Sequence, residues 1–198
     1  KENKDIYYVS DESMQSQYIN MFKAQGLDAV IMPSVMDTHF ISFIEMKEEG
    51  VKFKRIDSTV DENVQKDAEE DAGFNEKLAD IFKNALGDDN MKIEVKPLKQ
   101  EETSAVILLS EESRRMQEMY RSYGQQFAGM SDMFKDELTL VINSNNSIIK
   151  KIETLGDEEK NMVCHHVYDL AMLCHKPLSP EKMTEFVKRS NEIMEKVF

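Results

Sequence analysis

The sequence predicts a protein of mixed α/β and α+β class. It consists of a small strand-helix-strand unit, then a three-stranded sheet with helices, and finally a C-terminal helix pair. Over the first sixty residues, short β-branched and aromatic runs alternate with helical patterns. Further along the chain, three apolar or alternating runs are separated by helical segments. The last forty residues contain two amphipathic helical patterns and little else.

The first unit follows from its apolar runs and its helix signals. The predicted elements are a strand at Ile6–Val9, a helix from Asp11 to about Gly26, a strand at Leu27–Met32, a helix from about Asp37 and a strand within residues 51–56. A strand-helix-strand unit of this length favours parallel pairing, because parallel strands need a crossover connection. No Gly-x-Gly-x-x-Gly motif follows the first strand, which argues against a dinucleotide site.

An acidic segment with almost no core residues, 57–73, is the best domain boundary in the chain. Three strands are predicted after it, in residues 91–98, at Ala105–Leu109 and at Glu137–Asn143. The predicted helices cover Phe74–Ala85, ended by Gly87, and about Glu111 to Ala128, and another follows Asn146. The last two helices run from Asp157 to about His175 and from Ser179 to the end. Ser179 and Pro180 form a strong helix start, with serine as N-cap and proline at the first helical position.

The composition excludes several partner classes. Asp and Glu outnumber Lys and Arg by 38 to 25, which gives a formal net charge of −13 and argues against a nucleic-acid partner. No apolar run approaches the ~20 residues that span a bilayer, so we expect no membrane partner. Two cysteines are too few for a disulfide framework, which suits a reducing compartment.

The run "CHHVYDLAMLCH" suggests a metal site, because it contains cysteine and histidine ligands. On one helix, however, Cys164 and His175 are separated by roughly 16 Å along the axis, too far to share one zinc ion. The sequence has no His-x-x-x-His or Cys-x-x-Cys pair, no Gly-x-Ser-x-Gly elbow and no glycine-rich phosphate loop. We therefore expect no catalytic, cofactor or metal site and no enzymatic activity in this chain.

A methionine- and tyrosine-rich stripe follows the predicted helix over residues 111–128. Met116, Met119, Tyr120 and Tyr123 fall on one face, and the opposite face is polar. Such a face can be core, an oligomer interface or an adaptable surface for variable partners, since methionine is unbranched and polarizable. Periodicity alone leaves these alternatives open.

The last two helices each present an apolar stripe. The candidate interface residues are Val163, Val167 and Leu170 on the first helix, and Met183, Phe186, Val187, Met194 and Val197 on the second. A terminal helix pair with such faces either covers its own core or pairs with a second copy into a four-helix bundle. The sequence pattern supports both equally.

The stretches "IYYVSDE", "QGLDAVIMPSVMDTHFISFIE", "STVDE" and "LTLVINSNNSIIKKI" together resemble the C-terminal part of the ninety-kilodalton heat-shock protein chaperones, most closely the bacterial members. The family's strand-to-helix motif keeps its frame here at Leu140, Ile142, Asn143, Ile148 and Ile149. Ser144, Asn146 and Ser147 replace its prolines and histidine, and Met36-Asp37-Thr38 stands where Ile-Asp-Glu is common. These departures indicate a divergent member.

The resemblance implies that residues 1–60 are the last α/β part of a middle domain and residues 61–198 a C-terminal dimerisation domain. It also implies a homodimer formed through the last two helices, and contact between the Met/Tyr stripe and non-native client proteins. ATP and magnesium would bind the full-length parent in an N-terminal domain that has no counterpart here. The C-terminal sequence matches neither eukaryotic tail signal of the family, so a bacterial, cytoplasmic form is expected.

Two other interpretations stay open. One is a structural homodimerisation module with no direct client role. The other is a fragment of a metabolic α/β enzyme, which would need a phosphate loop or a convergent catalytic cluster, and the sequence contains neither.

Overall fold

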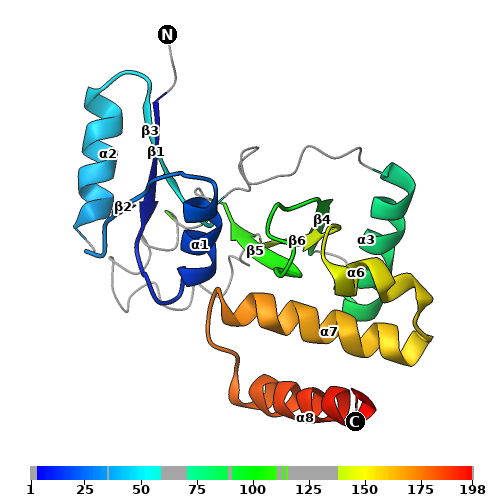
Figure 1. The fold of residues 1–198 in the computed structure, drawn as a ribbon. Helices are drawn as coiled ribbons and strands as arrows, with labels where there is room; N and C mark the ends of the chain where they lie inside the picture. The colour runs from blue at the N-terminus through cyan, green and yellow to red at the C-terminus, as the bar shows by residue number, and fades with distance from the viewer. Residues whose placement is uncertain are drawn as a thin grey trace. The chain divides into compact units, whose positions relative to one another are not determined.

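The computed structural model describes residues 4–34, 36–58, 71–88, 91–110, 113, 115 and 138–197, with only the backbone of Val197. The chain forms two compact units: Lys1–Asp61 with Leu108–Leu138, and Glu62–Ile107 with Thr139–Phe198. Both strands and helices occur along the chain, in agreement with the predicted mixed fold (Figure 1). The division into functional domains at residue 60 stays a prediction.

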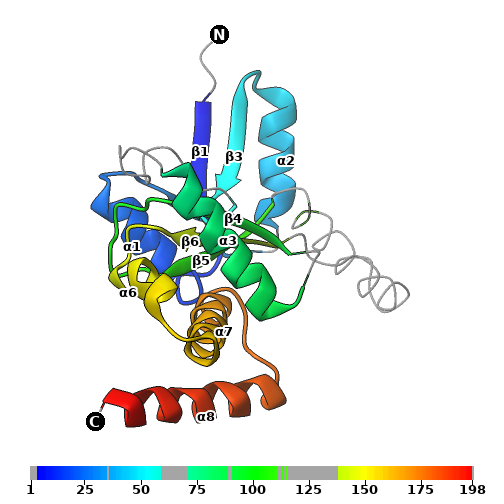
Figure 2. The ribbon, with the colours of Figure 1, turned by 90° about the vertical axis from the view of Figure 1, so that its right-hand side faces the viewer.

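The first unit contains a three-stranded sheet in the order β2-β1-β3. Its elements are β1 (Lys4–Val9), α1 (Ser16–Ala24), β2 (Val30–Ile31), α2 (Asp37–Lys47) and β3 (Val51–Arg55). The central strand β1 pairs in parallel with both neighbours, with Tyr8 opposite Val30 on one side and Ile6 opposite Phe53 on the other. The predicted parallel pairing is therefore confirmed. Figure 2 shows α2 alongside β3.

Helix α1 begins later than predicted, at Ser16 rather than near Asp11. The reason is local hydrogen bonding. The Asp11 carboxylate accepts the backbone N–H groups of Ser13 and Met14 in a turn, and the Gln15 side chain accepts those of Ser10 and Asp11. Asp11 therefore caps this turn, and the Gln15 N–H donates to the Asp11 carbonyl, but the continuous α-helix begins only at Ser16.

The second unit contains the sheet β4-β6-β5. Its elements before the last two helices are α3 (Ala72–Leu86), β4 (Lys92–Lys96), β5 (Ala105–Leu109), β6 (Leu138–Asn143), α6 (Ser147–Lys151) and the 3₁₀ turn η3 (Ile152–Thr154). β4 and β6 pair in parallel. All of β5 and the last four residues of β6 are buried, as is expected for strands covered on both faces. This sheet is the core of the unit.

An asparagine-rich turn leads from β6 into α6, at the position where the sequence departs from the family motif. Asn143 is fully buried, and its side chain accepts the N–H of Leu98 and donates to the carbonyls of Gln100 and Thr103. The Asn146 carboxamide oxygen accepts two backbone N–H groups at the start of α6. Side-chain hydrogen bonds therefore fix this turn in the absence of proline.

Two helices end the chain, α7 (Asp157–Leu173) and α8 (Pro180–Val197). Ser179 caps α8 as predicted, since its hydroxyl accepts the N–H of Lys182 and its carbonyl accepts that of Met183. In Figure 1 the two helices run in opposite directions, and in Figure 2 α7 is seen nearly end-on with α8 lying across it. Of the helices described, none is long and apolar enough to cross a bilayer.

Candidate interaction surface on helices α7 and α8

One face of helix α7 is part of the core of the second unit. Cys164, Val167, Ala171 and Met172 are buried, spaced three or four residues apart or adjacent, as one side of a helix requires. α7 packs against α3, whose Leu78 and Phe82 are fully buried. Val167, predicted as an interface residue, therefore fills its own unit, and any role for it in a dimer stays a prediction.

Helix α8 lies on α7 without entering that core. Over residues 180–196 no α8 side chain is buried, and the half-buried ones are Phe186, Arg189, Ser190 and Ile193. The two helices therefore differ in what they contribute to the core of the unit. α7 covers its own core, whereas α8 adds almost nothing to it.

The contact between these helices, here called the α7–α8 seam, comprises the residue pairs that follow. The Phe186 ring stacks on the His166 ring, with centroids 4.9 Å apart and planes inclined by 3°. Arg189 Nη1 donates to Asp169 Oδ2 at 2.7 Å. Two more exposed contacts join Lys196 to Glu159 at 3.4 Å and place Lys182 Nζ 5.9 Å from the Tyr168 ring centroid. The seam is therefore aromatic and ionic rather than aliphatic.

The ion pair in this seam is almost shielded from water. The Asp169 side chain is 7% exposed and that of Arg189 is 15% exposed. A charge in such a place must be paired, because removing one partner leaves the other desolvated. Asp169 and Arg189 therefore fix how α8 lies on α7 more than they stabilise the fold.

The apolar stripe of α8 points away from the seam. Met183 is 37% exposed, and Val187 and Met194 are each 50% exposed. At about 100° per residue, this stripe lies roughly 100° around α8 from the positions that face α7. On α7, Leu170 is 41% exposed and Val163 is half-buried. Of the remaining predicted interface residues, Phe186 stacks on His166, and the side chain of Val197 lies outside the described residues.

The cysteine and histidine run does not form a metal site within the described ranges, where no three Asp, Glu, His or Cys side chains gather suitably. Cys164 is fully buried, and burial raises the pKa of its thiol to about 12. Burial also raises the pKa of Cys174. Neither thiol has the lowered pKa of a nucleophile.

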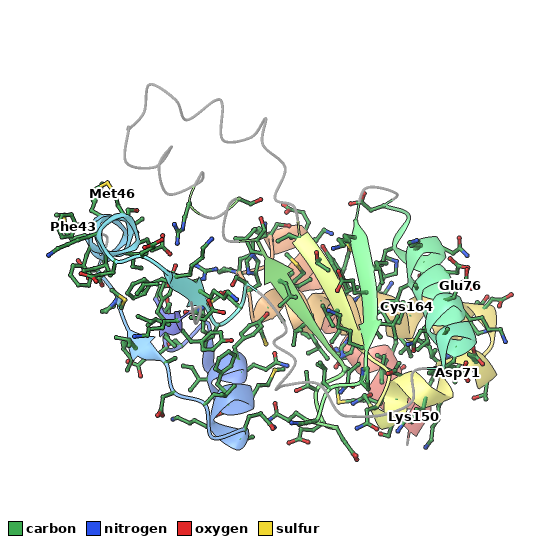
Figure 3. The ribbon with its side chains drawn as sticks, turned by 90° about the horizontal axis from the view of Figure 1, so that it is seen from above. Phe43, Met46, Asp71, Glu76, Lys150 and Cys164 are labelled. Atoms are coloured by element: carbon green, nitrogen blue, oxygen red, sulfur yellow. The ribbon has the colours of Figure 1, made fainter. Side chains whose placement is uncertain are left out.

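An exposed apolar face on α2 was not predicted from the sequence. Phe40, Phe43 and Met46 of α2 and its N-cap residue Met36 are all exposed, whereas Ile41 is buried against β1 and β3. Figure 3 shows Phe43 and Met46 projecting from the outer side of α2. The signal was present, because apolar residues at 36, 40 and 43 repeat at helical spacing beside a second repeat at 41 and 44.

The predicted client-contact residues Met116, Met119, Tyr120 and Tyr123 lie outside the described residues. Just before them, Arg115 makes two hydrogen bonds to the carboxylate of Glu45 on α2, at 2.8 and 3.0 Å. Glu45 also accepts the backbone N–H of Phe53 in β3 at 2.7 Å. Within the first unit, these bonds connect Arg115 to α2 and, through Glu45, to β3.

The model of the Hsp90 protein family matches residues 1–198, which is the whole chain. The chain belongs to the Hsp90 family. This confirms the resemblance found in the sequence and favours the family interpretation over a metabolic enzyme fragment.

Similar proteins of the Hsp90 family are named chaperone protein HtpG. One from Bacteroides fragilis is 33% identical over 171 residues, covering 81% of this chain and 24% of that protein. One from Bacteroides thetaiotaomicron is 30% identical over 206 residues, covering 98% of this chain and 28% of that protein. One from Psychrobacter arcticus is 24% identical, covering 98% of this chain and 30% of that protein. The chain thus spans about a quarter of the length of the curated relatives it matches.

Proposed function

We propose that this chain is the dimerisation and client-contact portion of an ATP-dependent Hsp90-family chaperone that assists the folding of other proteins. Its membership of the family supports a chaperone role. The observation that supports dimerisation is helix α8, an 18-residue amphipathic helix with no buried side chain between residues 180 and 196. Such a helix needs a further apolar surface to be stable, because most helical stability in proteins comes from packing.

A second copy of the chain is the partner that this surface fits. Exposed Met183, Val187 and Met194 form a stripe of about three helical turns, and Leu170 adds an exposed aliphatic side chain on α7. A self-complementary pairing of two helix pairs gives a four-helix bundle with closed two-fold symmetry. Complete burial of such side chains contributes about 1.5–3 kcal/mol each, enough for a stable dimer when several are covered.

The client-contact part of the proposal concerns Met116, Met119, Tyr120 and Tyr123. Methionine adapts to irregular apolar partners, and tyrosine tolerates water at its hydroxyl. These properties suit a surface that meets many non-native proteins. The alternative is a homodimerisation module with no client role of its own.

The nucleotide would act elsewhere in the full-length protein. We infer that ATP and magnesium bind the parent chaperone outside this chain, because the sequence contains no glycine-rich phosphate loop. We place the parent in the cytoplasm, since the chain has only two cysteines and its HtpG relatives are bacterial. The net charge of −13 disfavours nucleic acid and anionic membrane surfaces as partners.

The dimer is tested by sedimentation velocity at tens of micromolar. The wild-type chain should sediment as a dimer and Val187→Asp as a monomer, because the new charge would be buried between copies. Phe186→Asp is a poorer choice, since Phe186 also contacts His166 within the chain. The matched control is Lys188→Asp, an exposed neighbour on another face of α8 with a larger charge change, which should stay dimeric. A monomeric wild type would refute the proposal.

The client role is tested by suppression of aggregation of an unfolded model protein. Met119→Ser and Tyr120→Ser should weaken suppression while leaving the melting temperature almost unchanged. Glu118→Gln, on the polar side of the same sequence pattern, serves as the control. If the wild-type chain does not suppress aggregation, the alternative of a homodimerisation module is favoured. A steep loss of melting temperature in both variants would make these side chains core.

A further inference from the structure

Helix α8 depends on the α7–α8 seam for its position. Among its residues 180–196 none is buried, so hydrophobic burial contributes little to keeping it on α7. The most shielded contacts are the Phe186–His166 stack and the Arg189–Asp169 ion pair. One of these four side chains, His166, can change its charge near neutral pH. The stripe of Met183, Val187 and Met194 moves with the same helix.

His166 is placed to be neutral in the seam. Its ring lies parallel to that of Phe186, and its Nδ1 atom is buried without a hydrogen-bond partner. A proton added to Nδ1 would create a buried N–H donor with no acceptor. An unsatisfied buried polar group is costly, and a charged one more so.

The neighbouring charges do not offset that cost. Arg189 on α8 and Asp169 on α7 are the charged groups acting on His166, and they already pair with each other. For His165, next on α7, burial and then Arg189 and Lys182 of α8 lower the pKa, and Asp169 and the Ala85 backbone of α3 oppose them. A proton on either histidine would therefore add a positive charge to a seam whose only nearly buried carboxylate in the described residues is already paired.

The titration of both histidines has the same direction. Burial lowers the pKa of His166 below its ordinary value, Arg189 lowers it further, and Asp169 opposes them. Burial likewise lowers the pKa of His165. Release of α8 would uncover the His166 ring and restore its ordinary proton affinity, so release takes up a proton. The seam is then fully stable above the ordinary histidine pKa and weakens as the pH falls below it.

We propose that the α7–α8 seam is an acid-sensitive contact. Protonation of His166 releases α8 from α7, and the dimer weakens as the pH falls from about 7 to about 5. This inference rests on the proposed role of the Met183, Val187 and Met194 stripe as the dimer surface. Released α8 no longer holds that stripe in a fixed position relative to α7. Rebuilding the interface must then include the entropy of ordering the helix again.

The test measures the dimer dissociation constant of the whole chain by sedimentation at about pH 7.5 and about pH 5.5, with amide hydrogen exchange of α8 as a local readout. The wild-type dimer should weaken several-fold in acid. Because the intrinsic rate of amide exchange itself falls with pH, exchange is compared as protection factors, and those of α8 should drop in acid while those of β6 do not. His166→Phe keeps a stacked ring that cannot titrate, so both changes should shrink. His166→Gln provides a second neutral variant should phenylalanine not fit. His39→Gln, an exposed histidine in the other unit, should behave like wild type.

The outcomes separate the two proposals. If the wild-type dimer has the same dissociation constant at both pH values, the proposal of an acid-sensitive seam is overturned and the dimer proposal stands. Equal acid weakening in wild type and both His166 variants also overturns the acid-sensitive seam. If the chain is monomeric at both pH values, the dimer proposal is refuted, and the acid sensitivity of the seam is then tested by amide hydrogen exchange of α8 alone. An acid-induced drop in the protection factors of α8 that shrinks in His166→Phe supports it, and α8 protection factors that are the same at both pH values overturn it.

Discussion

Helices α7 and α8 have nearly the same length, 17 and 18 residues, and both were predicted from the same kind of apolar periodicity. Their environments differ completely. α7 buries Cys164, Val167, Asp169, Ala171 and Met172, whereas α8 buries nothing between residues 180 and 196. Periodicity therefore shows that a helix has an apolar face but not which surface covers that face.

The way each helix is held also differs. α7 is fixed by apolar packing against α3, which is hard to disturb with solution conditions. α8 is fixed mainly by a ring stack and ionic contacts, which respond to pH and to single charge changes. Matched substitutions on the two helices should therefore give opposite patterns of folding and assembly defects.

The largest expected effect comes from a charge on the inner face of α7. Val167→Asp should lower the free energy of unfolding of the second unit by at least about 3 kcal/mol, because Val167 is 3% exposed and the carboxylate would have no partner. In dilute, monomeric protein, Val187→Asp should change it by no more than about 0.5 kcal/mol. Urea unfolding measures both. Similar losses for the two variants would contradict the difference between the helices.

The next effect concerns the buried ion pair. Asp169→Asn should leave the Arg189 guanidinium unpaired, which costs up to about 3–5 kcal/mol for a fixed pair. When α8 leaves α7, Arg189 is hydrated again. The destabilisation caused by Asp169→Asn therefore cannot exceed the free energy that holds α8 on α7. Amide exchange of α8 should therefore increase while global unfolding changes little. The control is Lys196→Met, which removes an exposed contact worth about 0–1 kcal/mol.

Helix caps provide a smaller, matched comparison. Asp71 Oδ1 accepts the N–H of Phe74 at the start of α3, and Ser179 Oγ accepts that of Lys182 at the start of α8. Asp71→Ala should cost about 1 kcal/mol in urea unfolding, since α3 is packed in the core. Ser179→Ala should lower the helix content of α8 with almost no change in global unfolding. Equal shifts in the urea midpoint would argue that α8 is part of the core.

The smallest effect is the titration of the buried thiol of α7. Burial raises the pKa of Cys164 to about 12 from a usual 9.0, so the folded protein holds the neutral thiol. Unfolding then releases a proton at high pH, and the free energy of unfolding falls as the pH rises above about 9. In the native chain at mildly alkaline pH, iodoacetamide should modify the half-buried Cys174 before Cys164. Equal rates at the two thiols would mean that α7 opens readily.

Elements fixed by local chemistry were predictable from the sequence. Gly26 and Gly87 have positive φ angles of 66° and 62° where the sequence predicted helix ends, and Ser179 caps α8 as expected. The position of α1 was less well predicted, because Gln15 accepts backbone N–H groups through a side chain that has no strong capping signature. When a helix start depends on such individual bonds, its first residue is harder to predict from the sequence than the presence of the helix.

The α7–α8 seam was not predicted, because Asp169 and Arg189 lie twenty residues apart on different helices. A weak signal did exist. His166 and Asp169 are three residues apart, as are Phe186 and Arg189, so each helix presents one ring and one charge on a common face. The dimer residues were inferred from family resemblance and periodicity, and periodicity could not separate Val167, which is buried, from Val187, which is exposed.

Methionine oxidation by hydrogen peroxide, followed by mass spectrometry, tests directly whether the α8 stripe pairs with a second copy. Met194 is 50% exposed and Met46 on α2 is 81% exposed, so each chain contains its own reference. At tens of micromolar, Met183 and Met194 should oxidise slowly, and on dilution below the dimer dissociation constant their rates should rise toward the constant rate of Met46. Oxidation of Met194 at one rate across all concentrations would contradict pairing of the α8 stripe between two copies.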